Sequence, residues 1–138
     1  MKTGYVFGGL MLILGLAGCS VHSSMLIKNT VVVKNIAGNA YEPHNKRVFI
    51  THAHLPETAK YETLAKIDVG KATYGTYDYV YENMADSARE IGADAVVDVE
   101  TWMQPGGWGW STPHGRGVAV KITEAESVDL QNLSGYWK

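Results

Sequence analysis

The fold is decided by residues 77–102, which read YDYVYENMADSAREIGADAVVDVETW. In the first part of this stretch, apolar residues recur every three or four positions, which predicts an amphipathic helix with one buried face. The buried stripe is Val80, Met84, Ala88 and Ile91, broadened by Tyr77, Tyr81 and Ala85, whereas Glu82, Asp86, Arg89 and Glu90 fall outside it. A strand follows without a spacer, so helix and strand are expected to form one supersecondary unit.

The two ends of the helix carry their own signals. Asp78 is expected to cap the first turn, because its carboxylate accepts a backbone N–H and suits the positive end of the helix. Gly92 is expected to follow the last turn in the left-handed conformation, which glycine adopts without strain. The helix is therefore predicted to stop just before Gly92.

The strand after Gly92 has a period of two. Ala95, Val97 and Val99 alternate with a second set, Asp94, Val96, Asp98 and Glu100. This alternation predicts a strand with one buried face. We expect the helix to pack on the face of Ala95, Val97 and Val99, with the charged residues of the second set facing solvent.

The rest of the chain predicts further strands and one long loop. Strands are expected at residues 30–36, 47–54 and about 61–71 before the helix, and at 118–123 after it. Turn-forming residues predict loops at 37–46 and 104–115, the second being a long hairpin loop rich in glycine and tryptophan. The expected fold is α+β, a mostly antiparallel sheet of about five strands in the order β-β-β-α-β-β with one main helix on one face.

One helix covers only one face of such a sheet. The second face is then polar, covered by the hairpin loop, or used for oligomerisation. We expect this α+β domain to occupy residues 29–124, and residues 125–138 to be a polar C-terminal tail with a short helix.

Composition limits the classes of function. The 138 residues are 46% hydrophobic and 19% charged, which suits one globular domain. The formal net charge is −2, so we expect no nucleic-acid partner. The single cysteine excludes an intramolecular disulfide and a metal site built from cysteines.

The N-terminus has the anatomy of a secretory signal. Lys2 precedes an apolar run at residues 5–16, which is shorter than the roughly 20 residues of a membrane-spanning helix. The run leads into the sequence Leu16-Ala17-Gly18-Cys19, which resembles the bacterial lipobox.

The lipobox resemblance implies a lipid anchor. Residues 1–18 would be a signal peptide that is removed, and Cys19 would receive diacylglycerol and a fatty acid such as palmitate. Residues 19–28 would then be the lipidated N-terminus and a tether. Ser20 after the cysteine implies the outer membrane, with the domain on its periplasmic face.

A second resemblance covers about residues 47–124. Its motifs are Leu55-Pro56, Tyr61-Glu62-Thr63-Leu64-Ala65-Lys66-Ile67 and Ala88-Arg89-Glu90-Ile91-Gly92-Ala93-Asp94-Ala95-Val96-Val97-Asp98-Val99. This sequence resembles the YbjQ-type heavy-metal-binding domain and is similar to the related domain of RcsF-type outer-membrane lipoproteins. The resemblance implies an α+β fold, assembly into rings, and a role in the cell envelope such as the relay of envelope stress. The paired cysteines of RcsF-type domains are absent.

Histidines form the first candidate site. His52 and His54 are two positions apart on the strand predicted at 47–54, so their rings are expected on one face, where they suit a divalent transition metal. A third ligand would come from His44, His114, Asp98 or Glu100. The alternative is a polar strand end without a metal.

Tryptophans form the second candidate site. Trp102, Trp108, Trp110 and Arg116 lie within or beside the segment 105–117, which is rich in glycine and proline. Tryptophan gives a large rigid contact area, which favours a clamp for a peptide, a glycan or a partner subunit. The alternative is a loop folded over the uncovered face of the sheet, with the tryptophans as core.

The sequence contains no nucleophile elbow, phosphate loop or His-Glu-x-x-His motif, and we expect a protein that is not an enzyme and uses no cofactor. The leading hypothesis is a binding or assembly module anchored in the outer membrane through Cys19, with an envelope protein or a second copy as its partner. The alternative hypothesis is a metal-binding envelope lipoprotein that uses the surface histidines.

Overall fold

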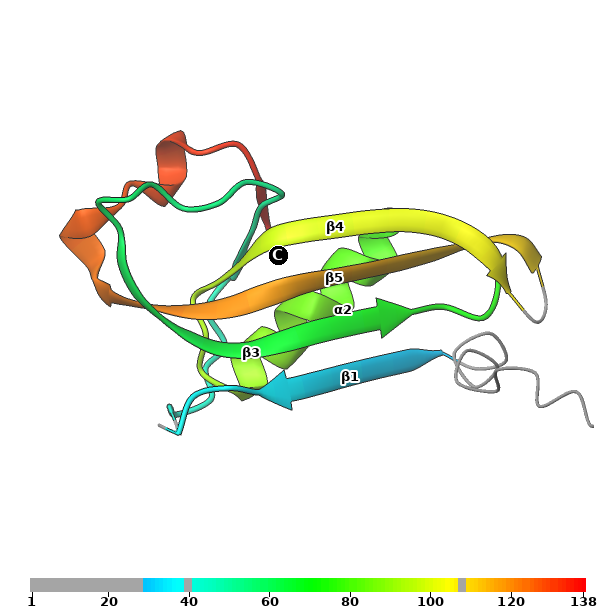
Figure 1. The fold of residues 1–138 in the computed structure, drawn as a ribbon, viewed down its shortest axis with the longest axis horizontal. Helices are drawn as coiled ribbons and strands as arrows, with labels where there is room; N and C mark the ends of the chain where they lie inside the picture. The colour runs from blue at the N-terminus through cyan, green and yellow to red at the C-terminus, as the bar shows by residue number, and fades with distance from the viewer. Residues whose placement is uncertain (1–28, 39–40, 107–108) are drawn as a thin grey trace, which may run out of the picture.

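The computed structural model describes residues 29–38, 41–106 and 109–138. Within them the chain forms one six-stranded sheet and one main helix (Figure 1). The strands are β1 (Thr30–Asn35), β2 (Phe49–Ile50), β3 (Lys60–Gly70), β4 (Ala95–Gly106), β5 (Gly109–Glu124) and β6 (Tyr136–Trp137). The helix α2 spans Tyr77–Glu90, and the short 3-10 helices η1 (Ala125–Ser127) and η2 (Leu130–Asn132) precede β6. In this part of the chain no helix is long and apolar enough to cross a membrane.

The strands lie in the order β1-β3-β5-β4-β2-β6. Every neighbouring pair is antiparallel except β2 and β4, which are parallel. The α+β class and the mostly antiparallel sheet are confirmed. The order β-β-β-α-β-β is wrong, because β6 follows β5 and pairs with β2. At two residues, β6 is too short to show an alternating pattern in the sequence.

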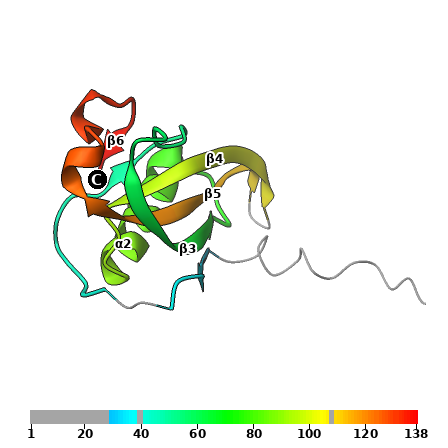
Figure 2. The same cartoon turned by 60° about the vertical axis from the view of Figure 1, so that its left-hand side comes forward.

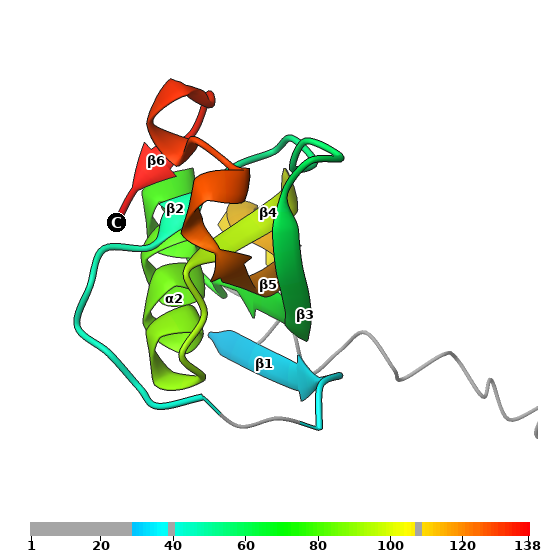
Figure 3. The same ribbon diagram turned by 90° about the vertical axis from the view of Figure 1, so that its left-hand side faces the viewer.

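The helix α2 lies along one face of the sheet, as Figure 3 shows from the side. Val80, Met84 and Ala88 of the predicted stripe are fully buried. They pack in a cluster with Ile67 of β3 and Ala119 of β5. The 3.6-residue pattern therefore placed the helix and its buried face correctly.

The prediction for the start of the helix is wrong, and the prediction for its end is confirmed. Thr76, not Asp78, is the N-cap, and no side chain caps the first turn. The Asp78 carboxylate instead accepts from Lys138 Nζ at 3.0 Å. Gly92 has a φ of 75°, as predicted, and a Cβ there would lie 2.6 Å from Tyr41 Cβ. Glycine is therefore required at this position by both conformation and space.

A bulge in β4 reverses which residues face the helix. Asp98 has a φ of 52°, and the pairing with β5 shifts register between Val97 and Glu100. Val96 and Val99 pack in the cluster under α2, whereas Ala95 and Val97 pack on the opposite face. The predicted common face of Ala95, Val97 and Val99 is wrong, because one extra residue in a strand changes the face of every residue beyond it. The prediction that the helix packs on Ala95 and Val97 is also wrong: these residues precede the bulge, and because Val96 between them is apolar too, alternation did not indicate which face the helix covers.

The segment expected to be a polar tail, residues 125–138, is part of the folded domain. It folds back onto one end of the sheet (Figure 2). The Trp137 ring lies 5.2 Å from the ring of Phe49. A second core cluster, opposite the helix, consists of Phe49, Leu55, Ala59, Ala95, Val97 and Val120, with Val128, Leu130, Leu133 and Trp137 packed on it.

The long hairpin loop predicted at residues 104–115 is mostly strand. β4 continues to Gly106 and β5 begins at Gly109, although the predicted pairing of these two strands is confirmed. Two glycines of β5 allow close packing rather than a loop. A Cβ on Gly115 would lie 2.6 Å from Val80 of α2, and one on Gly117 would lie 2.7 Å from Val96. These glycines let β5 pass close to the helix and to β4.

Candidate functional site

The face of the sheet opposite α2, here called the outer face, has two halves. The covered half carries the second core cluster under residues 125–138. The open half is formed by the parts of β3, β4 and β5 that lead away from this cluster, and in the described chain no helix lies over it (Figure 1). Its exposed side chains are the candidate site.

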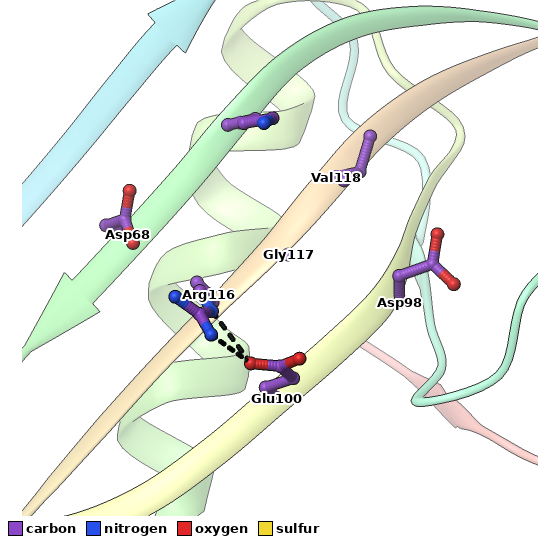
Figure 4. A pocket seen from close by; sticks show the side chains of 7 residues that line it. Asp68, Asp98, Glu100, Arg116, Gly117 and Val118 are labelled. Carbon is purple, nitrogen blue, oxygen red and sulfur yellow. Dashed lines mark hydrogen bonds and ion pairs between the residues drawn. The ribbon is translucent and has the colours of Figure 1, made fainter.

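Strand pairing assembles the open half from three strands. Asp68 of β3 is opposite Arg116 of β5, which is opposite Glu100 of β4. Residues opposite each other in a sheet share a face, so these three side chains form a row across it. Figure 4 shows them on the side of the sheet away from the helix, with Asp98 nearby. The row borders a hollow of about 350 Å³, lined by Lys66, Asp68, Asp98, Glu100, Arg116, Gly117 and Val118.

Arg116 is held in place on this half. Its Nε and Nη2 atoms donate to Glu100 Oε2 at 2.7 and 2.6 Å, and its guanidinium carbon lies 5.8 Å from the centre of the Trp102 ring. Both Arg116 and Glu100 are 62% exposed, so the ion pair contributes little to stability. It does restrict the guanidinium to one orientation before a ligand arrives.

Trp102 has a rigid support. Its ring stacks on the His114 ring, with centroids 5.9 Å apart and planes 20° apart, and its Nε1 donates to Gln104 Oε1 at 2.7 Å. His114 is 1% exposed, and burial lowers the pKa of its imidazole below 6.5. Gly70 of the next strand provides space for this ring, because a Cβ there would lie 2.7 Å from His114 Nδ1. Trp102 therefore lies on a buried aromatic support.

Trp110 lies apart from Trp102 in the chain, at the start of β5. It is 84% exposed, more than any other large apolar side chain in the described part of the chain. Its backbone N–H donates to the Tyr74 hydroxyl at 3.4 Å. Of the four residues predicted to bind a partner, Trp102 and Arg116 are in contact, Trp110 stands exposed on the same hairpin, and Trp108 lies outside the described residues.

A series of side-chain contacts lies at the border between the two halves. His54 Nδ1 lies 3.1 and 3.0 Å from the two carboxylate oxygens of Asp98, and its Nε2 lies 3.3 Å from the Tyr61 hydroxyl. One tautomer satisfies both contacts: Nδ1–H donates to Asp98 and Nε2 accepts from Tyr61. The bulge at Asp98 turns its carboxylate toward this pair, a feature that the strand pattern did not indicate.

Of the predicted metal ligands, the structure brings His54 into contact with Asp98, whereas the remaining histidines contact other groups. β2 ends at Ile50, so His52 and His54 are not on a strand and do not share a strand face. His52 Nε2 lies 2.9 Å from the Tyr81 hydroxyl, and His44 Nε2 donates to the Ala93 carbonyl at 2.7 Å. His114 is buried beneath Trp102. Within residues 29–38, 41–106 and 109–138, no group of three or more His, Cys, Asp or Glu side chains is placed to hold a metal ion.

The short strand explains the error in the histidine prediction. The regular pairing of β2 with β4 covers only two residues. Thr51 and Ala53 still bond to β4, but at its bulge: the Thr51 carbonyl accepts from Val99 N–H at 3.1 Å and the Ala53 carbonyl accepts from Asp98 N–H at 3.2 Å. The regular ladder therefore ends where β4 bulges, and the local sequence of residues 47–54 does not encode this bulge.

Comparison with protein-family models, with curated proteins and with solved structures found no match for this chain. The resemblances to the lipobox and to the YbjQ-type and RcsF-type domains therefore rest on the residues quoted above and stay predictions. Cys19, on which the lipid anchor depends, lies outside the described residues.

Proposed function

We propose that this protein is a non-enzymatic binding module of the cell envelope, anchored by lipid on Cys19 to the periplasmic face of the outer membrane, and that it binds an envelope protein through the open half. The observation that carries the proposal is Arg116, fixed between Glu100 and Trp102 beside the hollow. Arginine and tryptophan are the residues most enriched at the energetic centres of protein interfaces.

The charge of the hollow indicates the kind of partner surface. Lys66 and Arg116 supply positive charge, and Asp68, Asp98 and Glu100 supply negative charge. Mixed charge of this kind gives specificity and orientation more than affinity. The partner segment is therefore expected to carry both acidic and basic side chains, with an apolar group that contacts Trp110.

The exposed Trp110 supplies the apolar part of the contact. A tryptophan that is 84% exposed has most of its surface available for burial by a partner. It lies on the same hairpin as Trp102 and Arg116, so one partner can contact all three residues. The lipid anchor would keep this surface near other envelope proteins, which raises their effective concentration.

Binding is tested by cross-linking the full-length lipidated protein in intact cells and identifying the captured protein. Trp110→Ala and Arg116→Ala are each expected to reduce capture of the same protein about tenfold or more, which corresponds to about 1.4 kcal/mol. Met103→Ala, an exposed apolar residue on the same hairpin, and Lys60→Ala, an exposed cation elsewhere, serve as matched controls. Equal capture by all four variants would refute binding through the open half.

The anchor is tested separately with Cys19→Ala. We expect this variant to lose acylation and to accumulate as unprocessed precursor or as released protein, because the thiol that receives the lipid is missing. Membrane fractionation and mass spectrometry measure both properties. A variant that is as membrane-bound as the parent and has the same processed size would show that Cys19 is not the anchor.

A further inference from the structure

The outer edge of β1 is an exposed apolar strand. β1 is the end strand of the sheet, and no described strand pairs with its other side (Figure 1). Val31, Val32 and Val33 are 43%, 49% and 36% exposed. Lys34 is the only charged residue of the strand. Sheet edges in soluble proteins are usually protected by charge, proline or a covering segment, so this edge has the properties of a pairing surface.

The hydrogen bonds of β1 fix which backbone groups point outward. Ile36 N–H donates to the Leu64 carbonyl of β3 at 2.8 Å, one position beyond the pairing of Asn35 with Ala65. Direction alternates along an antiparallel strand, so Thr30, Val32 and Lys34 bond to β3. Val31, Val33 and Asn35 therefore direct their N–H and C=O groups toward the free edge.

We propose that two copies of this chain pair through β1, antiparallel, about a two-fold axis at Val32. Val32 then lies opposite Val32 of the partner subunit, and Val31 lies opposite Val33 of the partner subunit. Outward-pointing groups meet outward-pointing groups in this register, as an antiparallel ladder requires.

The side chains favour this register over its neighbours. Pairing at Val32 gathers the three valines of each copy and places Lys34 opposite Thr30 of the partner subunit, so the two lysines stay apart. An axis at Val33 would place Lys34 opposite Val32 of the partner subunit and Asn35 opposite Val31 of the partner subunit. Like residues of high strand propensity paired directly across a ladder stabilise it, and mixed apolar and charged pairs do so less.

The chain that precedes β1 favours a second copy as the occupant of this edge. Residues 19–28 connect the proposed lipid anchor to β1, and fully extended they span about 33 Å. In the proposed register the two Thr30 residues lie about 13 Å apart along the ladder. Both tethers therefore reach the same membrane surface, a step that rests on the proposed anchor, whereas the strand pairing itself does not.

Anchoring of both copies in one membrane would also compensate for the small size of the interface. One six-residue strand edge buries far less than the roughly 1,200 Å² of a stable interface, so the pairing is weak for molecules free in solution. Two copies held on one membrane are concentrated near each other, and a weak contact then suffices. The two-fold axis is perpendicular to the sheet, so both open halves face the same direction and can bind one bivalent partner or two neighbouring ones.

Disulfide trapping in the full-length membrane protein tests the pairing. Val32→Cys is expected to give a disulfide-linked dimer under mild oxidation, because Val32 and Val32 of the partner subunit form a non-hydrogen-bonded pair with Cα atoms about 4.5 Å apart, within the range of a disulfide. Ile36→Cys, equally exposed but beyond the valines, is the control for random collision. The parent, with Cys19 as its single cysteine, gives the baseline.

A mixture tests the register itself. Val31→Cys and Val33→Cys chains are each expected to cross-link poorly alone and well when mixed, because each position faces the other across the axis. If Ile36→Cys cross-links as fast as Val32→Cys, or if Val32→Cys gives no more dimer than the parent, the proposal is wrong.

A like-charge substitution provides a second measurement in the membrane. Val32→Lys, introduced into both chains of the Val31→Cys and Val33→Cys mixture, places two positive charges opposite each other and is expected to abolish their cross-linking, with a melting temperature within a few degrees of the parent. Met103→Lys in the same mixture, which introduces the same charge at an exposed apolar residue of another strand, is expected to leave the cross-linking unchanged. Cross-linking that is insensitive to Val32→Lys would overturn the proposal, as would its absence from the mixture, which is expected if residues 20–28 of the same chain cover the edge. Capture of the protein partner through Trp110 and Arg116 is independent of this outcome.

Discussion

The two halves of the outer face share the long strands β4 and β5 and have opposite character. In the covered half, Phe49, Val97 and Val120 are almost completely buried beneath the C-terminal segment. In the open half, Glu100 and Arg116 of the same two long strands stand more than half exposed. The change occurs at the bulge of Asp98. One half therefore provides stability and the other leaves a surface free for recognition, and substitutions should separate these roles.

The largest loss of stability is expected from a substitution in the covered half. Phe49→Ala removes a ring that is 1% exposed and packs on Trp137, so we expect a loss of about 3–5 kcal/mol in the free energy of unfolding. The melting temperature would fall by about 10 °C or more. Chemical denaturation measures the free energy. A loss below about 1 kcal/mol would show that the C-terminal segment does not close a real core.

The next largest effect on stability is expected at Asp98, on the border between the two halves. Asp98→Val places a β-branched side chain at a φ of 52°, which costs about 1–2 kcal/mol of stability. Asp98→Asn is the matched control, because asparagine tolerates the left-handed region. Glu100→Val, two positions further along the strand, is expected to change stability less. Equal stability of Asp98→Val and Asp98→Asn in denaturation would mean that the bulge is not under strain.

In the open half, truncation is expected to leave the fold intact. Arg116→Ala removes an exposed ion pair and a cation–π contact, each worth about 1 kcal/mol or less. Trp110→Ala removes a side chain with little burial and is expected to change stability by about 0.5 kcal/mol or less. Thermal unfolding of these variants, beside the capture experiment, tells recognition from packing. A large drop in melting temperature would identify these side chains as cover for the sheet.

The smallest expected effect concerns pH. Burial lowers the pKa of His114 below its usual 6.5, so the unfolded chain binds a proton more readily than the folded one. The stability from a neutral His114 is fully present above pH 6.5 and is lost as the pH falls through the lower, folded-state pKa. His114→Asn is expected to flatten this slope in denaturation curves taken between pH 7 and pH 5. An unchanged slope in the His114 variant would contradict the assignment.

The sequence predicted the parts of this fold that local patterns encode. The helix ending before Gly92 was predictable because apolar spacing and a left-handed glycine are local signals. The strand β1 was predictable from its run of three valines, and β3 because it is long enough to show alternation. The bulge at Asp98 was not, since Asp98 lies in an alternating sequence and only pairing with β5 shows that the register shifts.

The candidate site was predictable in composition and not in arrangement. Trp102 and Arg116 stood out as residue types, yet their contact depends on the register between β4 and β5. The row of Asp68, Arg116 and Glu100 joins the hairpin of β4 and β5 to β3, which lies far from it in the sequence. The histidine pair failed for the related reason that the regular pairing of β2 ends where the distant strand β4 bulges.

The place of β2 between β4 and β6 also determines the order in which the molecule assembles. Phe49 pairs with Ala95 on one side and with Trp137 on the other, so closing this end of the sheet joins residues from both ends of the domain. Contacts between distant residues form late in folding, because a long loop must close first. The neighbouring elements α2, β4 and β5 are expected to fold early, and β2 is expected to dock last. Until Trp137 has emerged and docked, the apolar surface around Phe49 stays exposed, and this is the interval in which a newly made chain is most open to aggregation or to capture by a chaperone.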